Sequence, residues 1–318
     1  MKNRLLPLIF VLLLASCGHS GNQVLRQSSN DTVTDDYNRT VVVPAQPQRV
    51  VSLSPAVTEI LFALGAGDLL VGRTDFCTYP PEAANIPSVG GISNLNIEKT
   101  LSLNPDLVIS GSMVGKKITD QMDAMGTPMV CVIEKPRFEA LFDNIAAIGR
   151  LVGKEREADS LIQVLCCDLR NLREADAIEE SLPLKTQNSE LKTPTCYYVV
   201  GFGAGGNFTA GGNTFINDII RMAGGRNIAE DIDGWSYSLE ALVGEDPDYI
   251  IVRREDSAAF CSMKPYNTLT AVKKGHVIGI ESGTLDLQVP RNIDAVIYLR
   301  SRFGKTTIPP SPLPESGE

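Results

Sequence analysis

Residues 97–109 read IEKTLSLNPDLVI, and residues 239–251 read LEALVGEDPDYII. Each stretch has a glutamate at its second position and Pro-Asp at its ninth and tenth, so the matching residues stand 142 positions apart. Proline ends a helix, because it lacks an amide hydrogen and moves the preceding residue out of the helical region. The apolar run that follows is typical of a strand covered on both faces. Each stretch therefore predicts a short helix, a sharp stop and a buried strand.

A second pair of stretches repeats in the same order. Residues 59–65 read EILFALG, and residues 218–224 read DIIRMAG. Both have the apolar spacing of an amphipathic helix, and both end in glycine, which readily takes the left-handed conformation that closes a helix. Two repeats in one order predict two lobes of the same architecture.

Strands and helices are predicted to alternate within each lobe. In the first lobe we expect strands at Arg49–Ser54, Leu69–Thr74, Leu107–Ser110 and Met129–Glu134, with helices that begin near Pro55, Ile97 and Lys116. In the second lobe we expect strands at Cys196–Gly201, Tyr249–Arg253 and Val277–Glu281, with helices that begin near Thr214, Leu239, Tyr266 and Arg291. This alternation predicts an α/β fold, with a parallel sheet in each lobe and helices on both of its faces.

A long helix is predicted to join the two lobes. Residues 154–182 are rich in helix-forming residues and carry apolar side chains at helical spacing. At 1.5 Å per residue such a helix is about 40 Å long, enough to run from one lobe to the other. The expected lobes are residues 37–153 and 183–304. The proline-rich end, residues 305–318, is expected to be disordered.

The amino terminus has the pattern of an export signal. Lys2 and Arg4 precede the apolar run Leu5–Ala15, which is far shorter than the roughly 20 residues of a membrane-spanning helix. The run ends in Leu-Ala-Ser before Cys17, which resembles a bacterial lipobox, so we expect a signal peptide over residues 1–16 and a lipidated Cys17. The alternative is a plain secretory signal with an incidental cysteine. Residues 17–36 are expected to form a flexible tether from the membrane.

The charge of the chain argues against nucleic acid as a partner. The formal net charge is −9, and removal of the signal with its two basic residues leaves 27 basic against 38 acidic residues, or −11. A nucleic-acid-binding protein needs a basic face. The apolar fraction of 43% is ordinary for a chain that buries a real core.

Several motifs together resemble a known family. The stretch RVVSLSPAVTE at residues 49–59 is similar to the first strand and helix of the periplasmic binding proteins that serve vitamin B12, ferric-siderophore and haem importers. Tyr37–Val43 resembles the amino-terminal hairpin of that family. Further matches, in family order between about residues 37 and 302, are YPPEA at 79–83, the two Glu-to-Pro-Asp repeats, FTAGG at 208–212, AGGRNI at 223–228 and Pro290-Arg291. The resemblance implies two α/β lobes joined by one rigid helix, with a ligand between them and only a small closure on binding.

The resemblance also implies a role for Glu98 and Glu240. In the family, the matching glutamates project from the two lobes and meet arginines on the two permease subunits. A pair of carboxylates on one rigid body can recognise a two-fold partner and fix its orientation. The alternative is that a glutamate in a first turn only suits the helix dipole, which is worth about 0.3–1 kcal/mol.

The ligand is expected between the lobes, at loops that follow the carboxyl ends of the strands. We expect contacts from Phe76, Tyr79, Phe202, Phe208, Trp235, Tyr237, Arg253 and Arg291, within a wider lining that includes Ser54, Arg73, Ile92, Ser93, Asn207 and Arg254. Phe76 and Trp235 lie where the B12 binder of the family has aromatic residues, whereas Ile92 stands where that protein has a further tryptophan.

The arginines and aromatic residues also have ordinary explanations. Arg253 and Arg254 are neighbours at a strand end, so at most one of them is expected to face the ligand. Arginine suits the carboxylate or catecholate groups of an iron chelate, but it is equally common in surface ion pairs. Phe76 and Tyr79 could serve only to pack their loop.

Other functions lack their sequence patterns. Residues 201–206 fit G-x-G-x-x-G, but no helix opens directly after them, which disfavours a dinucleotide site. The chain has two histidines, His19 and His276, and shows no cluster that offers four metal ligands, so no metal or cofactor site is expected and any metal should arrive chelated. His276 would be the sole plausible general base of a hydrolase.

The sequence therefore predicts an exported substrate-binding lipoprotein that is not an enzyme. We expect it to capture an iron chelate, either a siderophore or haem, and to deliver it as a monomer to an ABC permease dimer with its ATPase subunits. A corrinoid is the alternative ligand within the same family. Two other hypotheses are a lipid-anchored enzyme that uses His276 and a haem scavenger that works without a permease.

Overall fold

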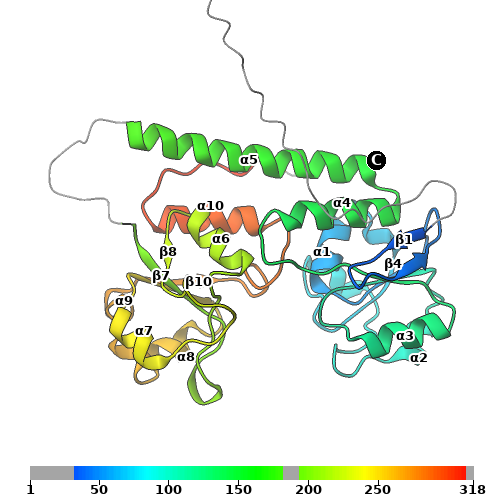
Figure 1. Cartoon of the computed structure of the whole chain (residues 1–318), viewed down its shortest axis with the longest axis horizontal. Coiled ribbons are helices and arrows are strands. Elements are labelled where there is room, and N and C mark those ends of the chain that lie inside the picture. Colours follow the sequence, from blue (N-terminus) through cyan, green and yellow to red (C-terminus); the bar gives the residue numbers. More distant parts are fainter. Residues whose placement is uncertain (1–31, 182–192, 313–318) are drawn as a thin grey trace, which may run out of the picture.

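A four-stranded parallel sheet forms the centre of each lobe (Figure 1). The computed structural model describes residues 32–181 and 193–312. In the amino-terminal lobe the strand order is β4-β3-β5-β6, with β3 at Val50–Ser52, β4 at Leu70–Arg73, β5 at Leu107–Ser110 and β6 at Met129–Cys131. In the carboxy-terminal lobe the order is β10-β9-β7-β8, with β7 at Thr195–Val199, β8 at Arg226–Asn227, β9 at Tyr249–Arg253 and β10 at Val277–Ile280.

The two sheets have the same topology. In each lobe the first strand in the chain lies between the second and the third, and the fourth strand follows the third at the edge. The predicted repeats occupy equivalent places: α1 (Pro55–Ala63) follows the first strand as α6 (Phe215–Met222) does, and α2 (Ile97–Ser102) precedes the third strand as α7 (Leu239–Glu245) does. The predicted two-lobe α/β fold is confirmed.

The remaining helices complete the layers around the sheets. The amino-terminal lobe also has α3 (Lys116–Ala124), α4 (Ala140–Val152) and two short 3-10 helices, η1 (Gly67–Leu69) and η2 (Pro81–Asn85). The carboxy-terminal lobe has α8 (Ser257–Ser262), α9 (Thr270–Lys274), α10 (Asn292–Arg302), η3 (Gly203–Gly205) and η4 (Tyr266–Thr268). Helices α4 and α8 and the two-residue strand β8 were not predicted.

The amino-terminal lobe begins earlier than predicted. β1 (Thr32–Thr34) pairs antiparallel with β2 (Thr40–Val42), so residues 32–36 belong to the lobe and not to a flexible tether. Asp35 in the turn is only 3% exposed, and its carboxylate accepts hydrogen bonds from the backbone amides of Tyr37 and Arg39 and from the Arg39 side chain. These contacts fix the hairpin, of which the family resemblance predicted the part at Tyr37–Val43 but not the strand at Thr32–Thr34.

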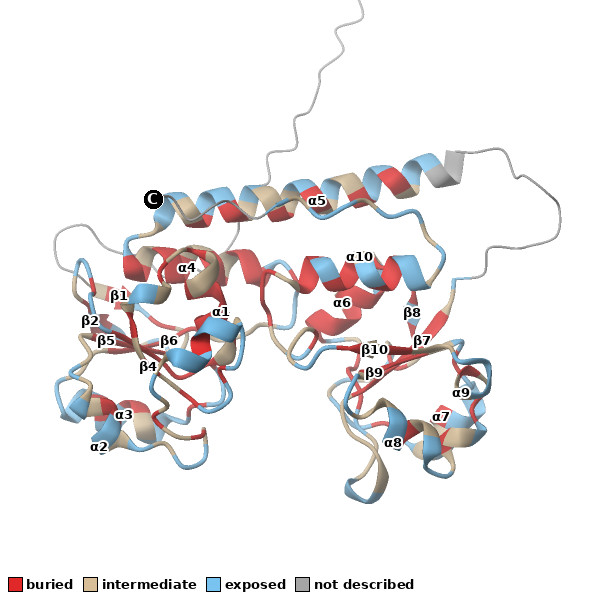
Figure 2. Ribbon diagram, turned by 180° about the vertical axis from the view of Figure 1, so that it is seen from behind, coloured by how far each residue is buried: buried red, intermediate tan, exposed pale blue. Residues whose placement is uncertain are grey.

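A single long helix, α5 (Glu155–Ser181), crosses from one lobe to the other, as Figure 2 shows. It packs on α4 of the first lobe and on α10 of the second. Its buried face carries the predicted apolar series, including Ala158, Leu161 and Leu165. The predicted connecting helix is thus present with nearly the expected bounds.

The chain after α10 is ordered up to Pro312, so the prediction of a disordered tail is wrong for residues 305–312. The backbone amide and hydroxyl of Ser311 both donate to the carboxylate of Asp168 on α5. Asp168 is buried, and these two bonds satisfy a charged group that would otherwise be costly to bury. The remaining part of that predicted tail, residues 313–318, lies outside the described residues.

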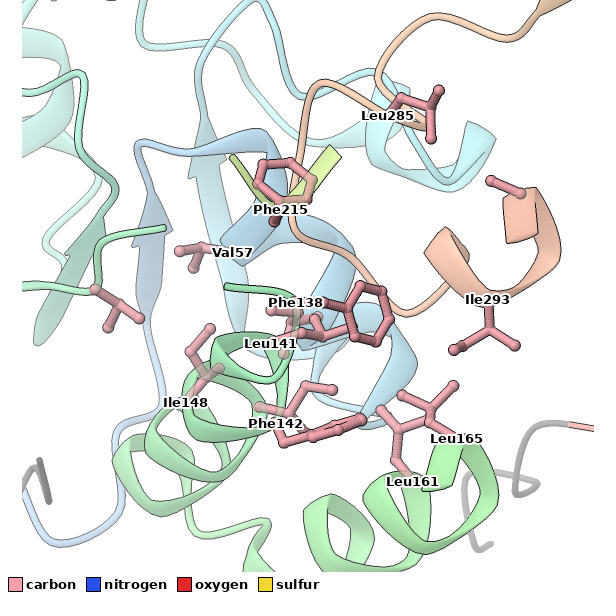
Figure 3. Close-up of a cluster of buried hydrophobic side chains, with 14 of the residues drawn as sticks. Val57, Phe138, Leu141, Phe142, Ile148, Leu161, Leu165, Phe215, Leu285 and Ile293 are labelled. Atoms are coloured by element: carbon pink, nitrogen blue, oxygen red, sulfur yellow. The ribbon is translucent and has the colours of Figure 1, made fainter. Parts of the chain in front are cut away.

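The two lobes share one continuous apolar core at their junction. Figure 3 shows Val57 of α1, Leu141 of α4, Leu161 of α5, Phe215 of α6 and Ile293 of α10 converging there. Separating the lobes completely would expose these side chains, at a cost of about 25 cal/mol for each Å² of apolar surface. The shared core therefore limits the lobes to small relative movements.

The predicted signal peptide, Cys17 and most of the predicted tether lie outside the described residues. Within residues 32–181 and 193–312, no helix combines the length and the apolar character that crossing a membrane requires.

Candidate ligand-binding cleft

A cleft of about 890 Å³ lies between the two lobes. Its walls come from the carboxyl ends of the parallel strands in both sheets, which is where open α/β sheets bind ligands. The lining residues are Leu53, Ser54, Pro55, Phe76, Ile92, Ser93, Gly111, Ser112, Met113, Glu134, Lys135 and Pro136 from the first lobe, and Val200, Asn213, Thr214, Phe215, Gly234, Trp235, Arg253, Asp286 and Leu287 from the second.

The first-lobe wall depends on close approach between two strand-end loops. Ser54 follows β3 and Gly111 follows β5. A Cβ atom at Gly111 would lie 2.8 Å from Oγ of Ser54, so a larger residue there would force Ser54 or its loop to move. Beyond them, Glu134 follows β6 and accepts a 2.8 Å hydrogen bond from the hydroxyl of Ser112.

The second-lobe wall presents Trp235 on a tightly held loop. The Trp235 carbonyl accepts a hydrogen bond from the Thr209 amide, and the Gly234 amide donates to the side chain of Asn213. A Cβ atom at Gly212 would lie 1.8 Å from the carbonyl oxygen of Glu230, so the backbones of the two loops pack directly against each other. The glycine-rich motif at residues 211–212 thus serves to place Trp235.

Two exposed aromatic side chains face the cleft from opposite lobes. Phe76 is 57% exposed and Trp235 is 47% exposed. Large aromatic side chains are normally covered in a folded protein, and exposed ones in a cleft offer a rigid apolar area to a ligand.

The charged groups of the cleft are balanced, and each has a partner within the protein. Arg253 donates to the carboxylate of Asp256 at 2.8 Å and to the Val200 carbonyl at 3.3 Å. The Lys135 ammonium lies 3.2 Å from Asp36. Among the acidic residues, Asp286 accepts a hydrogen bond from the hydroxyl of Tyr198, and Glu134 accepts one from the hydroxyl of Ser112. The cleft therefore has no strong preference for one sign of charge.

Metal-ligating side chains are scarce in the cleft. Among the described residues that line it, none is histidine, cysteine or tyrosine, and Met113 carries the one sulfur atom. Across the described ranges no group of three or more His, Cys, Asp or Glu side chains is arranged to hold a metal ion.

The structure brings three of the eight predicted ligand contacts to the cleft, namely Phe76, Trp235 and Arg253. It also places Ser54, Ile92 and Ser93 of the wider predicted lining there. Five of the lining residues that were not predicted are Met113, Glu134, Lys135, Asp286 and Leu287. All of these follow strands β5, β6 and β10, so the rule of strand carboxyl ends could have found them.

Three predicted aromatic contacts pack within or on the second lobe instead. Tyr237 is only 7% exposed and belongs to the core of that lobe, where its hydroxyl donates to the Ile228 carbonyl. Phe202 packs edge-on against Phe260 and Tyr266. Phe208 is 40% exposed but does not line the cleft, because its ring lies over the backbone at Gly201 and Gly206.

Tyr79 and Arg291 lie at a different cavity. The Arg291 guanidinium is paired with Glu59 and stacks on the Tyr79 ring, 4.2 Å from its centre. Both residues line a separate pocket of about 490 Å³ beside α5. Arg73 and Asn207 of the wider predicted set also have internal partners, since Arg73 donates to the Ala83 carbonyl and Asn207 accepts from the Tyr266 hydroxyl.

Glu98 and Glu240 have matching positions in the two lobes. Each is the second residue of its helix, after a side chain that caps the helix: Asn96 accepts from the Lys99 amide, and Ser238 accepts from the Ala241 amide. Both glutamates are exposed. Their helices α2 and α7 lie on the side of the molecule away from α5 (Figure 1).

Comparisons with known proteins agree with this architecture. The model of the periplasmic binding protein family matches residues 50–284. The ABC transporter substrate-binding lipoprotein YvrC of Bacillus subtilis (strain 168), itself uncharacterised, is 29% identical over 300 residues, which cover 91% of this chain and 92% of that protein. A cobalamin-binding protein of Halobacterium salinarum is 29% identical over 290 residues, covering 87% of this chain and 75% of that protein.

A solved structure is similar across both lobes. A periplasmic haem-binding protein from Pseudomonas aeruginosa is 27% identical and superposes with a TM-score of 0.71. The match covers 81% of this chain and 92% of that one.

Proposed function

The chain belongs to the periplasmic binding protein family, and on that premise we propose that it is the substrate-binding protein of an ABC importer for a metal chelate, with a corrinoid as the first candidate. A protein of this family works outside the cytoplasm, so the chain is an exported protein. The ligand would be captured in the cleft between the lobes and released to the permease.

The scarcity of metal ligands in the cleft carries the choice of a corrinoid. Protein-bound haem is normally held by an axial His, Cys, Met or Tyr side chain. Met113, which is 70% exposed, is the one such side chain among the described lining residues. A cobalamin brings its own axial ligands, so it needs only apolar area and hydrogen bonds. Phe76 and Trp235 supply that area, and several relatives are named for cobalamin or vitamin B12.

The sequence-based preference for an iron chelate rested on arginines, and the structure weakens that basis. Arg291 lies outside the cleft, and Arg253 is engaged by Asp256. A ferric siderophore stays the second candidate, because its iron is also fully coordinated and because Lys135 and Arg253 are within the lining. Haem is the third, supported by the structural neighbour named for it.

Docking on the permease is proposed to use Glu98 and Glu240. The support is their symmetry: two exposed carboxylates occupy the same place on two copies of one fold. We also propose that Cys17 carries a lipid anchor and that the protein acts as a monomer beside the permease dimer and its ATPase subunits. A scavenger without a permease would not need this symmetric pair.

An enzymatic role would need His276, and its position does not favour one. His276 stacks on Tyr249 with ring centres 5.0 Å apart, and Nδ1 lies 3.2 Å from the Asp248 carbonyl oxygen. Asp248 and His276 stand just before β9 and β10, at the amino ends of these strands, whereas the cleft lies at the carboxyl ends. We therefore propose that the chain acts as a binding protein and not as an enzyme.

The test is a titration of the full chain with cyanocobalamin, haemin and a panel of ferric siderophores. Fluorescence of Trp235 is followed, because the sequence contains a single tryptophan. Saturable quenching by cyanocobalamin, with heat of binding in calorimetry, is the expected result. Binding of haemin alone would reject the corrinoid proposal. No detectable binding of cyanocobalamin, haemin or any ferric siderophore would reject the metal-chelate proposal.

A further inference from the structure

Polar contacts cross the boundary between the lobes at several places, including a 3.1 Å hydrogen bond from the Phe138 amide to the Asp218 carboxylate. Two other sets of contacts lie behind the cleft. The first centres on Gln288, which is 1% exposed. Its amide nitrogen donates to the carbonyls of Lys135 and Arg137 at 2.8 Å, and its oxygen accepts from the Lys135 amide at 3.0 Å. Lys135 and Leu287 line the cleft from the first and the second lobe, so this contact lies next to residues of both walls.

The second contact is an ion pair between Glu59 of α1 and Arg291, which directly precedes α10. Nε of Arg291 lies 2.9 and 3.0 Å from the two carboxylate oxygens, and the side chains are only 5% and 11% exposed. The same guanidinium donates to Oγ1 of Thr284 at 2.6 Å and stacks on the ring of Tyr79. The pair thus joins helix α1 of one lobe to the β10–α10 connection of the other.

The ion pair stands on the α5 side of the junction, beside open space. The pocket of about 490 Å³ next to it is lined by Glu59 and Arg291 together with Leu165 and Asp168 of α5. The cleft is lined by none of these four residues. Along the chain, Leu287 lines the cleft, Gln288 is buried, and Pro290 and Arg291 line the pocket, so Gln288 stands between the cleft and the ion pair.

The surroundings of Glu59 are crowded with charge. Besides Arg291, the groups facing it are Glu281 after β10, whose carboxylate is 3.9 Å from Arg291, Asp294 of α10 and the Tyr79 hydroxyl, while Asp168 of α5 lines the same pocket. The pKa of Glu59 is raised to about 7, because burial and the nearby acids Glu281 and Asp294 together outweigh the lowering effect of Arg291. Glu59 therefore changes charge near neutral pH.

We propose that the Glu59–Arg291 pair is a proton-dependent latch that sets the relative tilt of the two lobes and hence the width of the cleft. With Glu59 ionised, a charge-assisted contact draws α1 toward the β10–α10 connection. When Glu59 takes up a proton from water, that attraction falls to a neutral hydrogen bond, and Arg291 can turn toward Glu281 in the adjoining space. The effect of the latch on a bound ligand rests on the proposed function.

The latch itself is tested without any ligand. The full chain is produced with 5-fluorotryptophan, which labels Trp235 alone because the sequence has one tryptophan. Trp235 lines the cleft, so its ¹⁹F resonance reports a change in cleft width. The expected result is a pH-dependent shift in the wild-type protein with a midpoint of about 7, which the Glu59→Gln variant lacks. The control is Asp120→Asn, which removes an exposed ion pair within α3 and should leave the titration unchanged.

A second variant keeps the test decisive if Glu59→Gln does not fold. Arg291→Lys keeps the charge but loses the planar fork of donors, so the midpoint should rise by about half a pH unit or more. A titration that persists in Glu59→Gln, an unchanged midpoint in Arg291→Lys, or no titration of the wild-type resonance across neutral pH overturns the latch.

The consequence for the ligand is tested separately with cyanocobalamin. Its dissociation rates on either side of the midpoint should differ roughly threefold or more in the wild type and be nearly equal in Glu59→Gln. Equal rates in the wild type would show that the latch does not act on the ligand. A wild-type protein that does not bind cyanocobalamin would contradict the proposed function while leaving the ¹⁹F result to decide on the latch.

Discussion

Asp106 and Asp248, which are equivalent residues of the internal repeat, each anchor the first strand of their own lobe. The Asp106 carboxylate accepts hydrogen bonds from the backbone amides of Gln48 and Arg49, at 2.7 and 3.0 Å, just before β3. Asp248 accepts from the amide and the hydroxyl of Thr195 at the start of β7, both at 2.9 Å. The repeated Pro-Asp motif thus has a structural role, because it ties the entry of the third strand to that of the first.

Replacing either aspartate should destabilise its lobe. We expect Asp106→Ala and Asp248→Ala each to lower the free energy of unfolding by about 1–2 kcal/mol, because two hydrogen bonds to a charged acceptor are lost. Urea denaturation followed by circular dichroism measures the change. Asp120→Ala, at an exposed ion pair, is the control and should cost about 0.5 kcal/mol or less. Equal effects of all three variants would contradict the anchoring role.

The aromatic walls of the cleft should dominate ligand affinity. We expect Trp235→Ala and Phe76→Ala each to weaken binding of the ligand found by titration by about 10- to 100-fold, since each removes a large apolar contact area. Isothermal titration calorimetry gives the affinities. Phe208→Ala is the matched control, because Phe208 is a similarly exposed aromatic residue that does not line the cleft. A loss with Phe208→Ala as large as with Trp235→Ala would mean that the ligand binds elsewhere.

Reversing the charges at Glu98 and Glu240 should abolish transport while leaving ligand binding intact. The double variant Glu98→Arg/Glu240→Arg is expected to keep full ligand affinity and to lose uptake, because arginine would repel a basic site on the permease. Uptake of labelled ligand by cells is compared with affinity measured on the purified protein. A second double variant, Asp120→Arg/Glu245→Arg, makes the same charge change at other exposed positions of the two lobes and should transport normally.

The raised pKa of Glu59 predicts a specific pH dependence of stability. Burial raises the pKa of this carboxyl from 4.5 to about 7, so the folded protein binds the proton more tightly than the unfolded chain does. The contribution of Glu59 is therefore most favourable below about pH 4.5, and about 3 kcal/mol is lost as the pH rises through 7. Unfolding curves across this range should show the loss in the wild-type protein and not in Glu59→Gln. Parallel curves for the two proteins would refute the assignment.

The close packing of the loop that holds Trp235 can be tested at its glycines. Gly212→Ala would bring a Cβ atom to 1.8 Å from the carbonyl oxygen of Glu230, so one loop must move and Trp235 with it. We expect ligand affinity to fall by about tenfold or more, with a loss of stability of about 1–3 kcal/mol. Gly205→Ala, which meets no atom within 4 Å, is the control and should change neither quantity. Wild-type affinity in Gly212→Ala would show that the loop position is unimportant.

Much of the fold could be predicted because its signals are local. The strand at Tyr249–Arg253 and the helix that begins at Ile97 were predicted with their observed bounds, since proline stops and unbroken apolar runs act over a few residues. The hairpin strand Thr32–Thr34 and the two-residue strand β8 were not predicted, because such short segments are stabilised by their pairing partners and carry little pattern of their own.

The two repeated α/β lobes, the long connector and the matching places of Glu98 and Glu240 near the start of their helices follow from the sequence pattern alone. Repeats, helical periodicity and helix caps are properties of neighbouring residues, so they can be read without coordinates.

Which side chains reach the cleft depends on the packing of the folded lobes and could not be predicted from local pattern. Tyr79 and Arg291 lie on the opposite side of the junction, and Tyr237 is in the core of the second lobe. Phe76 and Trp235 lie on the opposing walls of the cleft. Arg291 finds its partner Glu59 at a distance of 232 residues along the chain. The direction of a loop side chain depends on the surfaces that pack against it, and those surfaces exist only after the two lobes have folded together.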